Sequence, residues 1–271
     1  MYGEGSFAVQ NDSVVKTFVV AAVLCLVCSI MVSTAAVQLR PVQEKNKLRD
    51  RHRNILAAMG LWSEGASVED LFAEVQTKYV DLETGEYVEG IDPKEFSQKE
   101  AARDPERSIA IPSEIDSAGI KRRSKIAAVY LYPKTGGLEK VVLPVHGKGL
   151  WSTMYGYLAL GADLDSVEGF SIYEHGETPG LGGEVDNPAW KAQWKGKQAF
   201  GPDGEVRIQV KKGVVDLSSK DSKYEVDGLS GATITSRGVT ELLRFWLSEN
   251  GFGPYLNRLR NEGRKTAYGQ L

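Results

Sequence analysis

The chain has 271 residues, of which 33 are Lys or Arg and 36 are Asp or Glu, so its formal charge is -3. Hydrophobic residues make up 42% and charged residues 25%, which excludes a disordered or collagen-like chain and a protein with many membrane spans. No basic excess exists for binding nucleic acid through bulk charge, and two cysteines cannot form a disulfide framework.

The first predicted element is a membrane-spanning helix over residues 17–39. This run has no charged residue, and at about 1.5 Å per residue it extends roughly 34 Å, enough to cross a hydrocarbon core of about 30 Å. A cleaved signal peptide is the alternative interpretation, but its apolar region would be only about 7–15 residues long. We therefore expect an N-terminal tail over residues 1–16, an uncleaved anchor over residues 17–39, and a water-soluble remainder.

The charges beside the anchor predict an orientation. Only Lys16 precedes the anchor closely, whereas a cluster of basic residues follows it, so the positive-inside rule would keep the soluble part in the cytoplasm. The rule is weaker when a long domain follows. Cys25 and Cys28 lie inside the anchor and are interpreted as small packing residues, although another chain could complete a cluster with them. The basic residues after the anchor are Arg40, Lys45, Lys47, Arg49, Arg51 and Arg53.

The soluble part is predicted to be α+β, with an antiparallel sheet and flanking helices behind the single transmembrane helix. A membrane-proximal portion, residues 40–125, precedes the portion with the strongest strand patterns, residues 126–271. In the first portion we expect helices over 44–61 and 68–79, a hairpin over 80–88, and a helix followed by a loop over 93–111. In the second we expect strands over 126–132, 140–145, 155–162, 167–173, 206–210 and 213–215, and helices over 188–194, 233–247 and 255–260.

The usual signatures of catalytic sites are missing from the chain. It contains no GxSxG, HExxH, P-loop or strand-linked GxGxxG motif, so we expect no catalytic residue of its own. Its three histidines, His52, His146 and His175, are far apart in sequence and predict no metal site.

Three glycine-rich stretches are the candidates for a binding site: residues 146–152, 175–182 and 227–236. Each alone could be a turn between strands. The third places hydroxyl groups where a helix is predicted to begin, and a helix N-terminus offers free N–H groups and partial positive charge to an anion. A hydroxyl there could be esterified to a phosphate-bearing cofactor, and Thr233, Thr235 and Ser236 are all candidates.

The third stretch resembles the flavinylation motif of the FMN-binding domain family. The motif is Ser230-Gly231-Ala232-Thr233, preceded by Asp227, and the resemblance implies FMN bound by a phosphoester to Thr233. The sequences GKGLW at 147–151 and ETPGLG at 177–182 resemble two further hallmarks of the family. Trp151 could stack on the flavin or belong to the core, and Glu177 could accept hydrogen bonds from the flavin or cap a turn. The flavin contacts that the resemblance implies are Leu150, Trp151, Glu177, Thr178, Leu181 and Gly182.

The whole chain resembles the C-subunit family of the sodium-translocating NADH:quinone oxidoreductases, with its single anchor and a tail of the form FWLxxxGFGPYL at 245–256. The resemblance implies an electron-carrying protein with covalent FMN in a complex that oxidises NADH, reduces ubiquinone and exports sodium ions. Activity of the single chain is not expected. The alternatives are the G-subunit family of the Rnf complex, or a membrane-anchored binding or assembly protein without redox function.

The resemblance also implies partners and a location. Subunits B, D, E and F would be neighbours, and a flavin transferase would attach the FMN from FAD with Mg²⁺. In bacteria this transferase works outside the cytoplasmic membrane. The resemblance therefore places the soluble domain in the periplasm, anchored to the inner membrane, against the charge distribution. No nucleic-acid partner is expected.

Overall fold

The computed structural model describes residues 14–93, 95–134 and 137–268. The chain forms two compact units, Met1–Asp50 and Arg51–Leu271. Most of the predicted N-terminal tail lies outside the described residues, but residues 14–16 already belong to the first helix.

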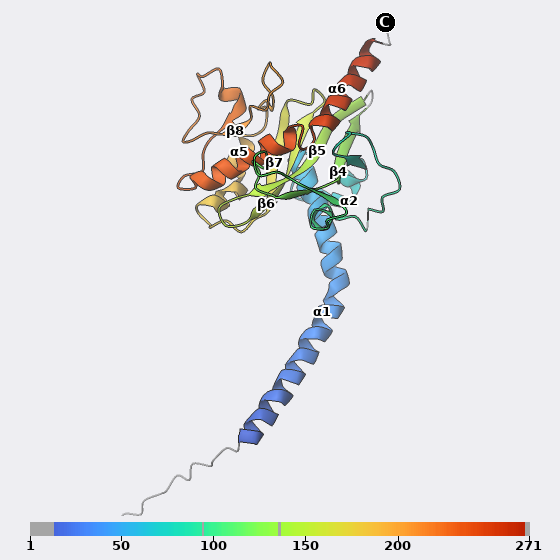
Figure 1. Ribbon diagram of the computed structural model, residues 1–271, viewed down its shortest axis with the longest axis vertical. Coiled ribbons are helices and arrows are strands. Elements are labelled where there is room, and N and C mark those ends of the chain that lie inside the picture. Colours follow the sequence, from blue (N-terminus) through green and yellow to red (C-terminus); the bar gives the residue numbers. More distant parts are fainter. Residues whose placement is uncertain (1–13, 94, 135–136, 269–271) are drawn as a thin grey trace, which may run out of the picture. The chain divides into compact units, whose positions relative to one another are not determined.

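The first helix, α1 (Val14–Ala58), joins two elements that were predicted separately, the anchor and the charged helix after it (Figure 1). It contains an apolar window of mean hydropathy 2.5, and none of that window is buried within the protein. Cys25 and Cys28 are exposed on this helix. Among the described residues, it is the one helix long and apolar enough to cross a membrane.

A five-stranded antiparallel sheet organises the second unit, in the order β1-β4-β5-β6-β7 (Figure 1). The four strands predicted between residues 126 and 173 are confirmed, with somewhat different ends. The strands are β1 (Gln76–Asp81), β4 (Ile126–Lys134), β5 (Gly137–Lys148), β6 (Thr153–Gly161) and β7 (Val167–Glu174).

The helix predicted over residues 68–79 is wrong in its second half. Helix α2 (Val68–Phe72) begins after Ser67, whose side chain accepts a hydrogen bond from the Asp70 N–H, but the chain then turns into β1. Residues of β1 such as Tyr79 and Val80 are aromatic or β-branched and buried, and the strand pairs with β4 along its whole length. Pairing with a distant strand therefore overrides the local helical pattern.

The predicted strand at 213–215 is also wrong. The Val215 N–H donates instead to Asp227 Oδ1 at 2.7 Å, and the carbonyl of Gly213 accepts from the Gly228 N–H at 2.8 Å. The predicted strand at 206–210 is reduced to β8 (Gln209–Val210), which pairs in parallel with β9 (Glu225–Val226).

The remaining short elements lie in the connections between the strands and around the C-terminal helices. Helix α6 is longer than predicted, whereas α5 has the predicted bounds. These elements are α3 (Gln98–Ala101), β2 (Ser108–Ala110), β3 (Arg122–Ser124), α4 (Pro188–Ala192), α5 (Thr233–Leu247), α6 (Gly253–Tyr268), and the 3-10 helices η1 (Gly182–Asp186) and η2 (Ser222–Tyr224).

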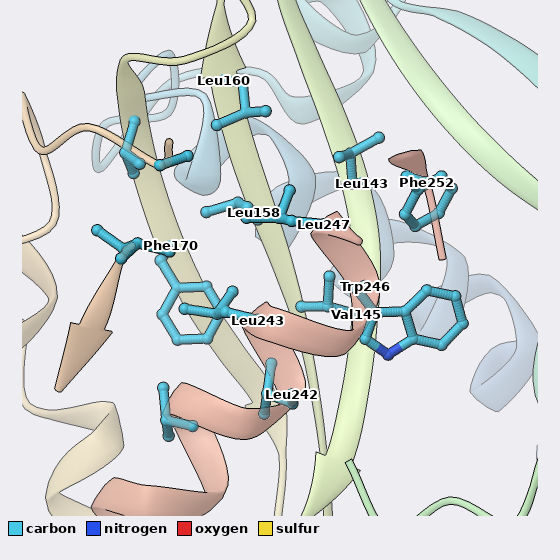
Figure 2. Packing of buried hydrophobic residues seen from close by; sticks show 14 of the residues in the cluster. Leu143, Val145, Leu158, Leu160, Phe170, Leu242, Leu243, Trp246, Leu247 and Phe252 are labelled. Atoms are coloured by element: carbon cyan, nitrogen blue, oxygen red, sulfur yellow. The ribbon is translucent and has the colours of Figure 1, made fainter. Parts of the chain in front are cut away.

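Both faces of the sheet are covered by apolar side chains. On one face, Leu143 and Leu158 of the strands pack with Leu243 and Trp246 of α5 (Figure 2). On the other face, side chains including Val142 and Tyr157 form a second cluster with the last turns of α1 and with α2. Neighbouring residues of one strand enter different clusters because side chains alternate between the faces of a strand.

Helix α5 is held close to β5, and this contact positions the start of the helix. The Trp246 indole N–H donates to the carbonyl of His146 at 2.6 Å. Nearer the start of the helix, Gly238 leaves no room for a side chain, because a Cβ there would collide with the carbonyl oxygen of Lys148. The first turns of α5 therefore lie against the end of β5, where the β5–β6 connection begins.

Candidate functional site

The three glycine-rich stretches meet at one end of the sheet. The first contains the connection between β5 and β6, the second follows β7 and enters η1, and the third enters α5. The residues that tie them together come from all three, so the site depends on contacts across long sequence separations.

The Glu177 carboxylate is the point where the stretches join. Its Oε1 accepts hydrogen bonds from the N–H groups of Trp151 at 2.9 Å and Ser152 at 3.2 Å. Its Oε2 accepts from the Leu150 N–H at 3.1 Å and from the Thr235 hydroxyl at 2.6 Å. These hydrogen bonds cap the turn between β5 and β6, which is one of the two roles considered for Glu177. They also join this turn to a side chain of α5.

The Glu177 side chain is ionised in this environment. The residue is only 5% exposed, and burial alone would raise the pKa of its carboxyl. The hydrogen bonds from the Thr235 hydroxyl and from the three backbone N–H groups outweigh burial, and the pKa of Glu177 lies below its ordinary value of 4.5.

This depressed pKa predicts a loss of stability in acid. Because the folded protein favours the carboxylate, Glu177 stabilises the fold above its unfolded pKa of about 4.5 and loses this contribution as the pH falls through the lower folded pKa. Urea unfolding of the detergent-solubilised chain at pH 7 and at several values below pH 5 would measure the loss. Glu177→Gln should flatten this dependence, and an unchanged dependence in the variant would contradict the assignment.

Glycines allow the close approach of the three stretches. A Cβ at Gly149 would lie 2.6 Å from Glu177 Oε1, and one at Gly182 would lie 2.6 Å from Thr235 Oγ1. Gly231 has a φ of +69°, and a Cβ there would lie 2.9 Å from Leu181. These three glycines, one from each motif, are therefore required by the packing of the site.

The start of α5 has the features of an anion site. Its N-cap is Ala232, whose side chain makes no capping hydrogen bond, and the Ser236 N–H donates to the Ala232 carbonyl at 2.9 Å. Among the described residues, the N–H groups of residues 233–235 have no hydrogen-bond acceptor. These donors and the partial positive charge of a helix N-terminus fit a phosphate group.

The three hydroxyls that remained candidates for esterification differ in their surroundings. Thr235 is 1% exposed and donates to Glu177, and Ser236 is 6% exposed and accepts from the Leu229 N–H at 3.0 Å. Thr233 is exposed at the first position of the helix. Of the three, only Thr233 could be reached by a phosphate donor without first breaking a buried hydrogen bond. Ser230, earlier in the motif, is also exposed.

Asp227 holds the segment that leads into α5. Its Oδ1 accepts from the Val215 N–H, and its own N–H donates to Gln193 Oε1 at 3.0 Å. Its carbonyl accepts from the Trp190 indole N–H at 2.8 Å. The aspartate thus fastens this segment to α4 and to the loop around residue 215.

Several large apolar side chains are exposed around these contacts. Trp151 is 68% exposed and does not belong to the core, and Leu150 and Leu181 are also exposed. Ile234, beside Thr233, is exposed as well. It was not predicted as a site residue, although its position inside the third stretch could have indicated it. Thr178 is exposed and its carbonyl accepts hydrogen bonds from the Leu181 and Gly183 N–H groups. These apolar surfaces could pack against a planar aromatic ring.

Ser152 and His175 support the same loops and were not anticipated as site residues. The Ser152 hydroxyl accepts from the Gly176 N–H at 2.6 Å. His175 Nδ1 accepts from the Glu177 N–H at 3.1 Å, and its Nε2 lies 2.8 Å from Asp186 Oδ2. This pattern fits a neutral imidazole with its proton on Nε2. Ser152 directly follows the motif GKGLW at 147–151, and this position could have indicated its role.

The other two histidines are half-buried and pack against aromatic rings of the second unit. His146 contacts the rings of Tyr155 and Trp246, and burial together with the charge of Lys99 lowers its pKa to about 4. His52 stacks on Phe72 with ring centroids 3.5 Å apart, so it is not simply solvated. The described residues contain no group of three or more potential metal ligands.

Comparison with known proteins gives consistent matches. Residues 149–248 match the FMN-binding domain family. The C subunit of the Na(+)-translocating NADH-quinone reductase of Pseudomonas aeruginosa is 49% identical over 93% of this chain and 98% of its own length. The corresponding protein of Vibrio alginolyticus is 47% identical over 94% of this chain and 98% of its own length.

Two solved structures show the same fold. The crystal structure of Shewanella oneidensis NqrC matches with a TM-score of 0.73 and 37% identity, covering 80% of this chain and 99% of the other. The C subunit of the Na(+)-translocating NADH-quinone reductase from Parabacteroides distasonis matches with a TM-score of 0.62 and 29% identity, covering 80% of this chain and 96% of the other.

Proposed function

The chain belongs to the NqrC family, the C subunits of the Na(+)-translocating NADH-quinone reductases, and we propose that it carries its FMN covalently, as a phosphoester of Thr233. It is the FMN-binding subunit of this sodium-pumping enzyme. When bound, the flavin supplies the redox chemistry, and the protein determines its position and surroundings.

The observation that carries the proposal is the exposed Thr233 hydroxyl at the start of α5. Attachment would form a bond from Thr233 Oγ1 to the phosphorus of the FMN half of FAD. The pyrophosphate bond would break, AMP would leave, and the hydroxyl proton would pass to solvent. The resulting phosphodiester keeps one negative charge, which the N–H groups of residues 233–235 would stabilise.

The remaining predicted contacts divide into two roles. Leu150, Trp151 and Leu181 would cover the flavin ring, because their apolar side chains are exposed beside the attachment point. Glu177 would act through its hydrogen bonds to the β5–β6 connection and to Thr235, holding these surfaces in place. Gly182 and Thr178 would shape the turn that presents Leu181.

Mass spectrometry of the full chain tests the covalent link. The chain is produced with and without a flavin transferase, and the intact mass is measured after denaturation. We expect one FMN per chain only with the transferase, and peptide mapping should place it on the peptide containing residues 230–237. A flavin on a peptide without Thr233, or an unmodified chain in a flavin-containing complex, would contradict the proposal.

The chain is a subunit of a membrane complex with one N-terminal apolar helix, and other subunits of that complex are its partners. We propose subunits B, D, E and F as neighbours, and a periplasmic location at the bacterial inner membrane for the soluble part. A flavin transferase that works outside the cytoplasmic membrane would have to reach the soluble part, and this requirement supports the periplasmic location. Protease added to spheroplasts should then cleave the soluble part, and protection would contradict the periplasmic location.

We also propose that residues 40–125 form a membrane-proximal part with helices and a hairpin, and that residues 126–271 form the FMN-binding domain. Strand β1 comes from the first portion and pairs with β4 of the second. The two portions therefore share one sheet.

A further inference from the structure

A pocket of about 570 Å³ lies beside the β5–β6 hairpin in the second unit. Its floor includes two cross-strand pairs of the β5–β6 hairpin, His146 with Tyr155 and Lys148 with Thr153. Residues of α3 and of the segment 119–122 form its other walls. None of the residues assigned to the flavin site lines it.

The lining of this pocket is strongly basic. No aspartate or glutamate is among its lining residues, although acidic residues outnumber basic ones in the chain as a whole. Convergent charges of one sign in a recess raise the local concentration of ions of the opposite sign. The basic side chains of the lining are Lys99, Arg103, Lys121, Arg122 and Lys148.

One of these charges is neutralised by a neighbouring carboxylate. The Lys99 ammonium lies 2.6 Å from Glu174 Oε1 and 4.2 Å from the centroid of the Tyr155 ring. The charge of Lys99 nevertheless lowers the pKa of His146, although burial lowers that pKa more. The electrostatic influence of Lys99 therefore reaches the floor of the pocket.

The Arg122 guanidinium is held by neutral oxygens. Its Nε donates to the Ser108 hydroxyl at 2.9 Å, and its Nη2 donates to the Pro105 carbonyl at 3.4 Å and the Ser108 carbonyl at 3.5 Å. These contacts fix the position of the guanidinium, and no carboxylate among the described residues forms an ion pair with it.

Among the described residues, the other three basic side chains form no ion pair with a carboxylate. The Asp116 carboxylate adds one negative charge beside the segment 119–122, where its two oxygens accept from the backbone N–H groups of Ile120 at 3.0 Å and Lys121 at 2.7 Å. These bonds hold Lys121 at a φ of +63°, which is unusual for a residue with a side chain. A backbone conformation that costs free energy is thus maintained in the pocket wall.

We propose that this pocket binds a phosphate-bearing anion. Its volume falls in the range of small-molecule sites, about 300–1,000 Å³. A guanidinium matches a phosphate group with two parallel N–H donors, and a lysine adds a point charge. A phosphate group, as a monoester or as a diester, can accept hydrogen bonds from several of these cations at once. A soluble phosphate compound and a phospholipid headgroup share this chemistry.

Isothermal titration of the flavin-loaded full chain in detergent tests the proposal. The flavin-loaded chain is used so that the start of α5 does not add a second phosphate site. The probes are inorganic pyrophosphate and a short-chain phosphatidylglycerol, each at two salt concentrations. The double variant Arg103→Gln/Lys148→Gln removes two exposed charges of the pocket, and Lys195→Gln/Lys220→Gln removes two exposed charges elsewhere.

We expect at least one probe to bind, with affinity at least tenfold weaker in the Arg103→Gln/Lys148→Gln variant and within twofold of the parent in the control. The double variant Arg103→Lys/Lys148→Arg keeps both positive charges and should retain binding. This result would show that the loss in the Gln variant comes from the missing charges and not from a disturbed fold. Tighter binding of pyrophosphate would indicate a soluble ligand, and tighter binding of phosphatidylglycerol would indicate a lipid headgroup. The proposal is overturned if neither probe binds, or if the pocket variant and the control bind equally.

Discussion

Replacing Thr233 by Ala is expected to abolish covalent attachment of FMN while leaving the fold intact. The Thr233 side chain is exposed, and no hydrogen bond of the described residues depends on its hydroxyl, so its removal costs little stability. Without Oγ1 the phosphoester has no acceptor atom. Ultraviolet fluorescence of the denatured protein in a gel measures the covalent flavin, which should fall to background.

Two companion variants separate the acceptor from the rest of the motif. Thr233→Ser keeps a hydroxyl at the same position and should retain covalent flavin. Ser230→Ala removes another exposed hydroxyl close by and should also retain it. Fluorescence that persists in Thr233→Ala would move the attachment point elsewhere, and loss in Ser230→Ala with retention in Thr233→Ala would assign it to Ser230.

Replacing Glu177 by Ala is expected to destabilise the site and the fold around it. The variant removes the acceptor of three backbone N–H groups and of the Thr235 hydroxyl. A buried donor without a partner costs about 1–3 kcal/mol; the Thr235 hydroxyl is buried and the three N–H groups are partly buried, so the free energy of unfolding should fall by roughly 2 kcal/mol. Urea unfolding of the detergent-solubilised chain, followed by tryptophan fluorescence, measures this change.

The matched control is Glu205→Ala, which removes an exposed glutamate elsewhere in the same unit. Its free energy of unfolding should change by less than about 0.5 kcal/mol, as is usual for surface positions. Glu177→Ala should also reduce the yield of covalent flavin, because the β5–β6 connection would no longer be held beside α5. Equal stability of the two variants would show that the Glu177 contacts contribute nothing.

Local patterns predicted many of the elements of this fold. The uncharged run at 17–39 lies within one helix, and the four strands between residues 126 and 174 form adjacent strands of the sheet. Helix α5 has the predicted bounds, 233–247, because its apolar residues repeat with the helical period. Elements of this kind can be predicted because the residues that determine them are neighbours in the sequence.

The elements that were wrong or missed depend on distant partners. Residues 76–79 of β1 were predicted as the end of a helix and residues 80 and 81 as part of a hairpin, yet all six residues form one strand because β4 is available to pair with them. Strands β8 and β9 have two residues each and pair in parallel across a long loop. The basic pocket was not anticipated either, because its charges come from separate segments between Lys99 and Lys148.

The sequence by itself predicted a long apolar helix near the N-terminus and a flavin-binding motif, because uncharged length and a short motif are properties of contiguous residues. It left three hydroxyls open as attachment points and two roles open for Glu177. In the tertiary structure Thr235 and Ser236 are buried, Thr233 is exposed, and Glu177 contacts residues of two other segments, and these features support the proposed attachment at Thr233. Burial and hydrogen bonding depend on which distant segments come together, and this follows only from the packing of the whole sheet and its helices.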